Sequence, residues 1–418
     1  MSDIFIFLAQ AFFIIALPPA LTSLLRLHSM VPLVVMQIFL GILMGPSGLG
    51  RLAPELYAGL FPPGSLTFLS HVSSLALFFF AVLTGVHLDA GFLKGSGRKL
   101  GMISMASMVV PLLLGALAGV AVCALYPFAM PENGSVLEFA IGVGICCGVT
   151  ALPVLAAMLR ELDLTHQRLG QFALALAAGN DGMLWILLAV FLSFVHAEGA
   201  NAGNLLLMAT LIAAYVALVF LVVRPVLAAV ARRPAVSDGA KIIAVCGTAM
   251  TSAAATEYLG LHFLLGAFIA GAIVPAAWRK TLLAQLQPIT VNVLIPFFFI
   301  STGLKVLVDF HAAGFAEITA LVTACAIVGK VVGTSVAARL TGESWSFSLK
   351  LGSLAQAKGL MELVVATILL DAHVVSRTMF AALILMALVS TALTLPFMRL
   401  TSNRSTEPST PGVPASAS

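Results

Sequence analysis

Long apolar runs separated by short polar gaps dominate this chain. Division at the polar and Pro/Gly-rich gaps gives thirteen apolar segments. Most are near or above the roughly 20 residues that a helix needs to cross hydrocarbon. We therefore predict an all-α polytopic membrane protein with 13 transmembrane helices. The segments are 4–25, 31–45, 67–88, 100–126, 136–159, 168–195, 204–230, 240–258, 261–278, 287–308, 315–339, 347–370 and 376–399.

The basic residues in the gaps indicate a topology. When the gaps are assigned alternately to the two sides of a membrane, one side collects sixteen of the 21 Lys and Arg residues and the other side three. The positive-inside rule then places the N-terminus outside and the C-terminus in the cytoplasm. The remaining two, Lys330 and Lys358, lie within predicted spans.

A glycine-rich internal similarity indicates a repeat. Residues 40–46 (LGILMGP) in segment 2 resemble residues 265–271 (LGAFIAG) in segment 9. The offset of seven helices is odd, so the second copy is inverted in the membrane, as in many secondary transporters. We predict a transmembrane domain over 1–400, made of repeat 1 (about 4–195), a linker helix (204–230) and repeat 2 (about 240–399). The Ser/Thr/Pro-rich residues 401–418 are predicted to be a disordered cytoplasmic tail.

Composition agrees with a membrane protein and excludes several other classes. Hydrophobic residues make up 61% of the 418 and charged residues 9%, far below the roughly 25% charged residues of soluble domains. The net charge of +4 is small and dispersed, which argues against nucleic-acid binding. The five cysteines lie in apolar stretches without zinc or disulfide spacing. Segment 1 lacks a basic flank and a cleavage site, which predicts a retained helix.

The pair Asn180-Asp181 lies in the middle of the apolar segment 168–195. A charge at the centre of a bilayer costs roughly 2.5–3.5 kcal/mol on insertion scales, so such residues usually mark a functional site. The carboxylate of Asp181 can hold a proton or a dehydrated alkali cation, but hardly both, and competition between them produces antiport. Asn180 would serve as a hydrogen-bonding neighbour. The alternative is an aspartate that only holds helices together, permanently paired or protonated.

Helix-breaking residues cluster in two segments that correspond in the repeat. Segment 5 contains Gly148, Thr150 and Pro153, which predict an interruption, and segment 12 contains Gly359. Breaks at matching positions free backbone carbonyls that can coordinate a cation, and the Thr150 hydroxyl would add a ligand. The alternative is that these residues only allow close helix packing.

Three further charged residues lie in predicted spans. Lys330 is too deep to snorkel to either interface, so we expect a carboxylate partner, with Asp181 and Glu362 as the candidates. Lys358 and Glu362 are four residues apart and would neutralise each other on one helix face. We interpret that pair as structural support, whereas Lys330 is equally open to a structural and a functional role.

Five stretches together resemble the cation/proton antiporter-2 family over nearly the whole chain. They are 32–46 (PLVVMQIFLGILMGP), 150–162 (TALPVLAAMLREL), Asn180-Asp181, 296–304 (PFFFISTGL) and 329–333 (GKVVG). The resemblance implies a homodimer of thirteen-helix protomers. Each protomer would have a dimerisation domain and a six-helix core in which segments 5 and 12 cross at their breaks.

The resemblance also implies roles for individual residues. The aspartate matching Asp181 binds the ion and exchanges the proton, and the lysine matching Lys330 lies close to it. Electrogenic relatives have two adjacent aspartates, so Asn180 implies one proton per cation and electroneutral exchange, unless Lys330 itself releases a proton. This chain reads Lys358-Gly359-Leu360 where the family often has Arg-Gly-Glu. The family's glutamate is thus absent at position 360, and Glu362, two residues later, is the acid that remains nearby. Kef-type members add a cytoplasmic nucleotide-binding domain, and such gating is not expected here.

These observations predict a secondary antiporter, not an enzyme, that exchanges Na⁺ or K⁺ for H⁺ by alternating access, without a cofactor. Its expected partners are the two ions, membrane lipids and a second copy of the chain, and its expected location is a bacterial inner membrane. One alternative is a sodium-coupled organic-solute symporter of similar fold, and another is a Kef-like potassium efflux pathway. Neither a Gly-x-Gly-Asp pair nor a His-Glu-x-x-His motif occurs, which argues against an intramembrane enzyme.

Overall fold

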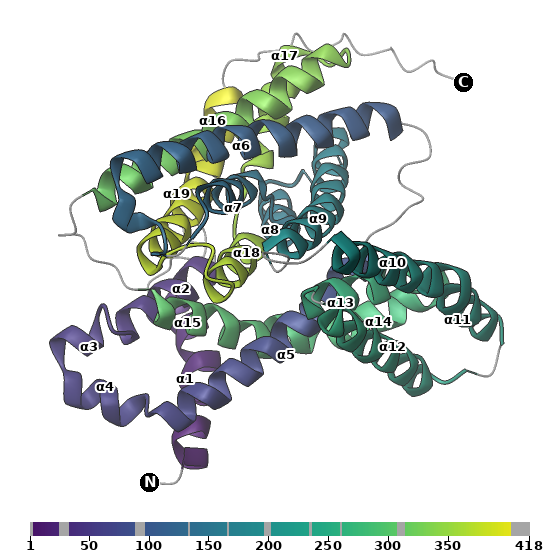
Figure 1. The fold of residues 1–418 in the computed structure, drawn as a ribbon, viewed down its shortest axis with the longest axis horizontal. Helices are drawn as coiled ribbons and strands as arrows, with labels where there is room; N and C mark the ends of the chain where they lie inside the picture. The colour runs from purple at the N-terminus through teal and green to yellow at the C-terminus, as the bar shows by residue number, and fades with distance from the viewer. Residues whose placement is uncertain are drawn as a thin grey trace, which may run out of the picture.

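The structure is a computed structural model that describes residues 3–24, 33–87, 97–132, 134–164, 167–195, 202–233, 236–259, 261–306 and 314–402. Within these ranges every regular element is a helix (Figure 1). The predicted tail, 401–418, lies almost wholly outside them. The α-helices are α1 (Asp3–Leu24), α2 (Leu33–Met44), α3 (Leu49–Leu52), α4 (Pro54–Leu60), α5 (Pro63–His87), α6 (Gly97–Leu125), α7 (Val136–Gly148), α8 (Leu152–Glu161), α9 (Arg168–Val195), α10 (Ala202–Leu218), α11 (Arg224–Ala231), α12 (Asp238–Tyr258), α13 (Phe263–Ala272), α14 (Ala276–Ile289), α15 (Ile295–Lys305), α16 (Phe315–Leu340), α17 (Trp345–Ala355), α18 (Leu360–Asp371) and α19 (Arg377–Ser402).

Nine helical stretches in the described ranges are long and apolar enough to cross a membrane. Two π-helical turns join shorter helices into longer ones, Val219–Val223 between α10 and α11 and Thr290–Leu294 between α14 and α15. The prediction of an all-α membrane protein is confirmed at this level. A count of thirteen spans also requires shorter helices such as α7 and α13, of 13 and 10 residues, to contribute to crossings, and it stays a prediction.

The predicted boundary between segments 261–278 and 287–308 is wrong. α13 ends at Ala272, and α14 begins after three further residues and runs through Arg279 and Lys280 without interruption. Arg and Lys are good helix formers, so their polarity ended the apolar run without ending a helix. α3 and α4 likewise occupy a gap between predicted segments.

The helices form two packed groups, which Figure 1 shows above and below a middle line. We call α6–α9 and α16–α19 the bundle, and α1–α5 and α10–α15 the scaffold. In the bundle α6 packs against α7 and α16, whereas in the scaffold α5 packs against α13 and α2 against α15. The groups meet where α9 contacts α13 and where α15 contacts α18. At the first contact Trp185 stacks on Phe268, with ring centroids 5.8 Å apart.

Ion pairs near the helix ends join positions that the charge count assigns to the same side. The carboxylate of Glu343, between α16 and α17, accepts a hydrogen bond from the Arg168 guanidinium at 2.8 Å and lies 3.9 Å from the Lys99 ammonium. These three residues come from three gaps that the charge count assigns to the same side. Lys305 and Asp371, which end α15 and α18 in gaps assigned to the other side, lie 3.4 Å apart. The alternating assignment of these gaps therefore agrees with the fold.

Two close helix contacts in the scaffold depend on glycine. Gly41 of α2 faces Gly303 of α15, and a Cβ at Gly41 would lie 2.5 Å from a backbone oxygen of α15. Gly85 of α5 faces Gly271 of α13, and a Cβ at Gly85 would lie 2.1 Å from a backbone oxygen of α13. Real Cβ contacts are not that short, so a larger residue would separate either pair. The two pairs join segment 2 to segment 10 and segment 3 to segment 9.

Candidate functional site

Two interrupted helices face each other inside the bundle. α7 ends at Gly148 and α8 begins at Leu152, so the interruption predicted for segment 5 is present. α17 ends at Ala355 and α18 begins at Leu360. The Ala151 N–H donates to the Ala357 carbonyl oxygen at 2.8 Å, which ties one break directly to the other. Because the breaks leave helix ends without intrahelical partners, this crossing concentrates backbone dipoles in the interior.

Gly359 provides the turn into α18. Its φ is 156°, a backbone conformation that residues with a side chain rarely adopt. A Cβ there would lie 2.7 Å from Cγ2 of Val154 in α8. Pro153 is the second residue of α8, a position where a proline does not remove a helical hydrogen bond. The two residues thus suit the ends of the interrupted helices in which they lie.

Asn180 and Asp181 lie in the middle of α9, beside the crossing, and are 1% and 2% exposed. Among the described residues neither carboxylate oxygen of Asp181 has a hydrogen-bond partner. Buried polar groups are nearly always bonded, and an unpaired buried carboxylate is especially costly. Asp181 is therefore available to a proton or to a cation in a way that a paired aspartate is not.

Asn180 connects α9 to the first break and to α6. Its amide lies 3.2 Å from the hydroxyls of Thr150 and Ser107. With the amide oxygen turned towards Lys330, that oxygen accepts from the ammonium at 3.2 Å, and the amide nitrogen donates to the Ser104 backbone oxygen at 3.1 Å. In this orientation each amide group has a complementary partner.

Thr150 joins the two breaks through its side chain. Its hydroxyl lies 2.9 Å from the backbone oxygen of Ala355, the last residue of α17. Since the same hydroxyl contacts Asn180, Thr150 links the first break to α9 and to the end of α17. Its role as a ligand of the ion stays a prediction.

Lys330, from α16, is fully buried, but its environment differs from the prediction. Its ammonium donates to the backbone oxygens of Ser107, at 2.8 Å, and Gly148. None of the ion pairs found among the described residues joins Lys330 to a carboxylate. The expected carboxylate partner is thus replaced by backbone oxygens and the Asn180 amide, because the end of α7 supplies free acceptors at the required depth.

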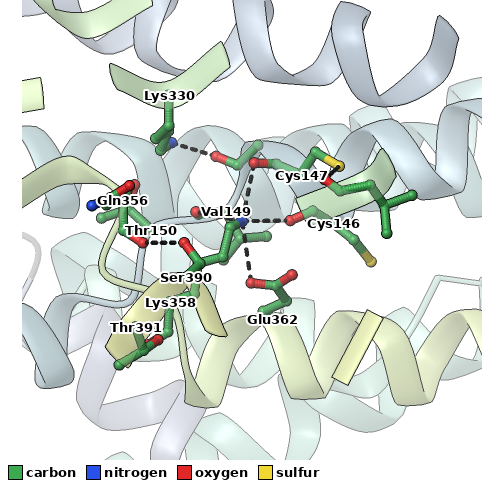
Figure 2. A network of polar contacts seen from close by, with 12 residues as sticks. Cys146, Cys147, Val149, Thr150, Lys330, Gln356, Lys358, Glu362, Ser390 and Thr391 are labelled. Carbon is green, nitrogen blue, oxygen red and sulfur yellow. Dashed lines mark hydrogen bonds and ion pairs between the residues drawn. The ribbon is translucent and has the colours of Figure 1, made fainter. Parts of the chain in front are cut away.

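Lys358 occupies the centre of the network in Figure 2. Its ammonium donates to the backbone oxygens of Cys146 and Cys147, both at 3.0 Å, and lies 3.2 Å from a carboxylate oxygen of Glu362. The pairing of Lys358 with Glu362 is confirmed, and both side chains are fully buried. Lys358 precedes α18, so the two residues do not share a helix face as predicted.

The carbonyls freed by the first break are therefore already engaged. The two lysine ammoniums together take the backbone oxygens of residues 146, 147 and 148, and Lys358 also lies 3.4 Å from that of Val149. Coordination of the ion by these carbonyls, each of which has a second lone pair, stays a prediction. Among the buried side chains of the described residues, both carboxylate oxygens of Asp181 lack a hydrogen-bond partner.

Sequence reasoning missed Ser104, Ser107 and Gln356. The two serines come from α6 and place hydroxyls or backbone oxygens beside Asn180. Their spacing of three residues in an apolar helix puts them on one face, and this signal was available in the sequence. Gln356 lies in the second break, where a lone amide gives no comparable pattern. No group of three or more His, Cys, Asp or Glu in the described ranges has the arrangement of a metal site.

Comparison with known protein families identifies the chain. The family model described as sodium/hydrogen exchanger, transmembrane, matches residues 11–399. The chain belongs to the sodium/hydrogen exchanger family. The predicted membership of a cation/proton antiporter family is confirmed, and the family together with the apolar helices establishes an integral membrane protein.

Relatives of this exchanger-family chain occur in plants, fungi and bacteria. It is 32% identical over 373 residues to Cation/H(+) antiporter 17 of Arabidopsis thaliana, covering 88% of the chain and 45% of the relative. It is 30% identical to K(+)/H(+) antiporter 1 of Saccharomyces cerevisiae (88% and 43% covered) and 29% identical to Na(+)/H(+) antiporter NhaS4 of Synechocystis (88% and 90% covered). The chain thus spans about half the length of the plant and yeast relatives.

The exchanger fold is also found in a solved structure. The sodium proton antiporter MjNhaP1 from Methanocaldococcus jannaschii superposes with a TM-score of 0.62, covering 96% of this chain and 97% of that one. At 15% identity this similarity concerns the fold alone.

Proposed function

We propose that the chain exchanges a monovalent cation, Na⁺ or K⁺, for protons across its membrane. The observation that carries the proposal is Asp181, a buried carboxylate beside two crossing helix breaks with no hydrogen-bond partner among the described residues. The names of the relatives, which are Na(+)/H(+) and K(+)/H(+) antiporters, support the same exchange.

The proposed chemistry is competition for one carboxylate. Asp181 binds either a proton or a cation, so release of one permits binding of the other. Thr150 supplies a hydroxyl near the ion, and Asn180 fixes that hydroxyl by its contact at 3.2 Å. Lys330 and Lys358 satisfy the carbonyls at the end of α7, and thus keep these backbone oxygens from binding a cation strongly enough to trap it. Glu362 neutralises Lys358.

One proton per cation, and hence electroneutral exchange, follows from the charges in this proposal. Of the two buried acidic residues near the crossing, Glu362 is paired with Lys358 at 3.2 Å. Asp181 is the acid left to exchange, and Asn180 adds no titratable group. Charge moved by the cation in one direction is then balanced by the proton moving in the other.

Alternating access would move the bundle against the scaffold. The most extensive helix contacts lie within each group and those between the groups are fewer, which supports rigid-body motion between them. Asp181 lies in the moving group and would be exposed to one side at a time.

We also propose the predicted architecture of thirteen spans in two inverted repeats. Exchange of segments 1–6 with 8–13 maps the glycine contact of α2 with α15 onto that of α13 with α5, which supports the repeat. Residues 78–85 (FFFAVLTG) of α5 and 297–303 (FFFISTG) of α15 add a second similarity at the same offset. The loop charges support an N-terminus outside and a C-terminus in the cytoplasm.

The remaining proposals concern assembly and location. The scaffold would supply a homodimer interface, as the family resemblance implies. The proposed location is a bacterial inner membrane. Its support is limited to the bacterial source of two relatives, from Synechocystis and Enterococcus hirae, which the chain matches over 90% and 89% of their length.

Proton flux in proteoliposomes tests the exchange. A pH gradient is imposed, Na⁺, K⁺ or Li⁺ is added in turn, and the parent is compared with Asp181→Asn. The proposal predicts cation-dependent dissipation of the gradient by the parent and none by the variant, which should remain folded because amide and carboxylate have the same shape. Cation-dependent flux at the parental rate in Asp181→Asn contradicts the assignment. Labelled-solute uptake without proton movement would favour the symporter.

A further inference from the structure

Gln356 lies in the second break, between α17 and α18, and hydrogen bonds fix the backbone on both sides of it. The preceding residue, Ala355, accepts from the Thr150 hydroxyl at 2.9 Å. The following residue, Ala357, accepts from the Ala151 N–H at 2.8 Å. Gln356 thus spans the point at which the breaks are joined, directly opposite Thr150 and Ala151.

Its own backbone oxygen is also engaged. The hydroxyl of Ser390 in α19 donates to it at 3.1 Å. Three consecutive backbone oxygens, those of residues 355 to 357, therefore accept hydrogen bonds from the Thr150 hydroxyl, the Ser390 hydroxyl and the Ala151 N–H. These hydrogen bonds fix the position of the Gln356 backbone, and therefore the point from which its side chain extends.

The side-chain amide of Gln356 has no such partner. Gln356 is fully buried, and within the described ranges neither Oε1 nor Nε2 has a hydrogen-bond partner. Burial of an unpaired amide costs roughly 1–3 kcal/mol by mutational measures, so a stable protein seldom retains one in its interior without a use. The other unpartnered acceptors beside the crossing include both oxygens of Asp181.

We propose that the Gln356 side-chain oxygen is a ligand of the cation that binds at Asp181, and that it contributes to selection among alkali cations. This inference rests on the proposed function. The residues next to Asp181 and Gln356 are linked through Thr150: the Asn180 amide contacts the Thr150 hydroxyl, and that hydroxyl contacts the backbone oxygen of Ala355.

A neutral amide suits this position for a chemical reason. Its oxygen is a strong dipolar ligand of the kind that replaces the hydration shell of an alkali cation, and selectivity depends on the number and field strength of such ligands. It carries no charge, so the site keeps the single negative charge of Asp181 and one proton still balances one cation. Two carboxylates at the same place would change that balance.

The test compares Gln356→Met with the parent in proteoliposomes. Methionine has a similar length and volume without the amide. We expect the apparent KM for the preferred cation to rise at least tenfold and the ratio of Li⁺, Na⁺ and K⁺ activities to change. Gln10→Met is the matched control, because Gln10 is a buried glutamine of α1 that is hydrogen-bonded to Ser65 at 3.0 Å, in the scaffold. The control should lose stability and keep the parental KM and cation ratio.

A purely structural Gln356 would give a different result. In that case Gln356→Met would lower the amount of folded, active protein with unchanged KM and an unchanged cation ratio, which overturns the inference. If the methionine variant does not fold, Gln356→Glu replaces it. The added carboxylate should lower KM for the cation and make exchange depend on membrane potential, and a parental KM with no such dependence also overturns the inference.

Failure of this inference is separable from failure of the proposed function. The parent and Asp181→Asn are measured in the same assay. If the parent shows no cation-dependent proton flux, exchange itself is wrong and the inference falls with it. If the parent exchanges and Asp181→Asn does not, while Gln356→Met behaves like the parent, only the role of Gln356 is wrong.

Discussion

Replacing Lys358 by methionine is expected to destabilise the protein strongly, because the lysine is the positive charge nearest Glu362 in a fully buried setting. The ammonium makes an ion pair at 3.2 Å and hydrogen bonds at 3.0 Å to two carbonyls at the end of α7. Methionine fills a similar volume but removes every one of these contacts. The change therefore isolates the charge from the packing.

The magnitude follows from the burial of the pair. Removing one partner of a buried ion pair costs about 3–5 kcal/mol, since the remaining charge is left uncompensated. Lys358→Met combined with Glu362→Gln removes that charge and should recover most of the loss. A deficit of about 1–3 kcal/mol should persist for the carbonyls that lose their donor.

The assay measures unfolding of the purified protein in detergent, with heat or SDS as the denaturant. Lys305 and Asp371 provide the matched control, because they form a Lys–carboxylate pair at 3.4 Å whose side chains are 43% and 63% exposed. Lys305→Met should cost less than about 1 kcal/mol. If Lys358→Met is as stable as the parent, or if the double variant is less stable than Lys358→Met alone, the assigned role of the buried pair is wrong.

Two further predictions concern the exchange site and the second break. Asn180→Asp places two carboxylates side by side, so exchange should become dependent on membrane potential. The measurement is proton flux with the potential clamped by an ionophore. Flux that stays independent of potential would contradict the charge balance proposed for Asp181. Gly359→Ala should abolish exchange and reduce the amount of folded protein, because its Cβ would lie 2.7 Å from Val154 and its φ is unfavourable. Gly247→Ala is the control: it lies in α12 with nothing within 4 Å of its Cβ, so expression and exchange should be unchanged. Equal behaviour of the two alanine variants would show that the geometry at the second break is not required.

Much of the fold could be predicted from the sequence because apolar runs and helix breakers report local properties. The run of segment 5 and its Gly148 and Pro153 located the first interruption. The ion pair of Lys358 with Glu362 was predicted correctly, but for the wrong reason, because Lys358 precedes α18 and does not lie on its face. The boundary after α13 was misplaced, because Arg279 and Lys280 end an apolar run but favour a helix.

The partners of the buried charges could not be predicted in the same way. A lysine in a span indicates that some acceptor is needed, and the sequence favours a carboxylate as the candidate. The acceptors of Lys330 are backbone oxygens of Ser107 and Gly148, which every residue carries and no residue type reveals. Gln356 was missed for a related reason, because its significance comes from unpaired atoms in the folded interior and not from any spacing.

The most direct test of the central claim is proton release when a cation binds to the purified protein in weakly buffered detergent solution. If Asp181 holds either a proton or a cation, binding should release up to one proton per cation at a pH where the carboxyl is protonated. The release should fall towards zero at a pH where the carboxyl is already ionised, and Asp181→Asn should release none. Cation binding without proton release at any pH, or undiminished release from Asp181→Asn, would show that the two ions do not compete for this carboxylate.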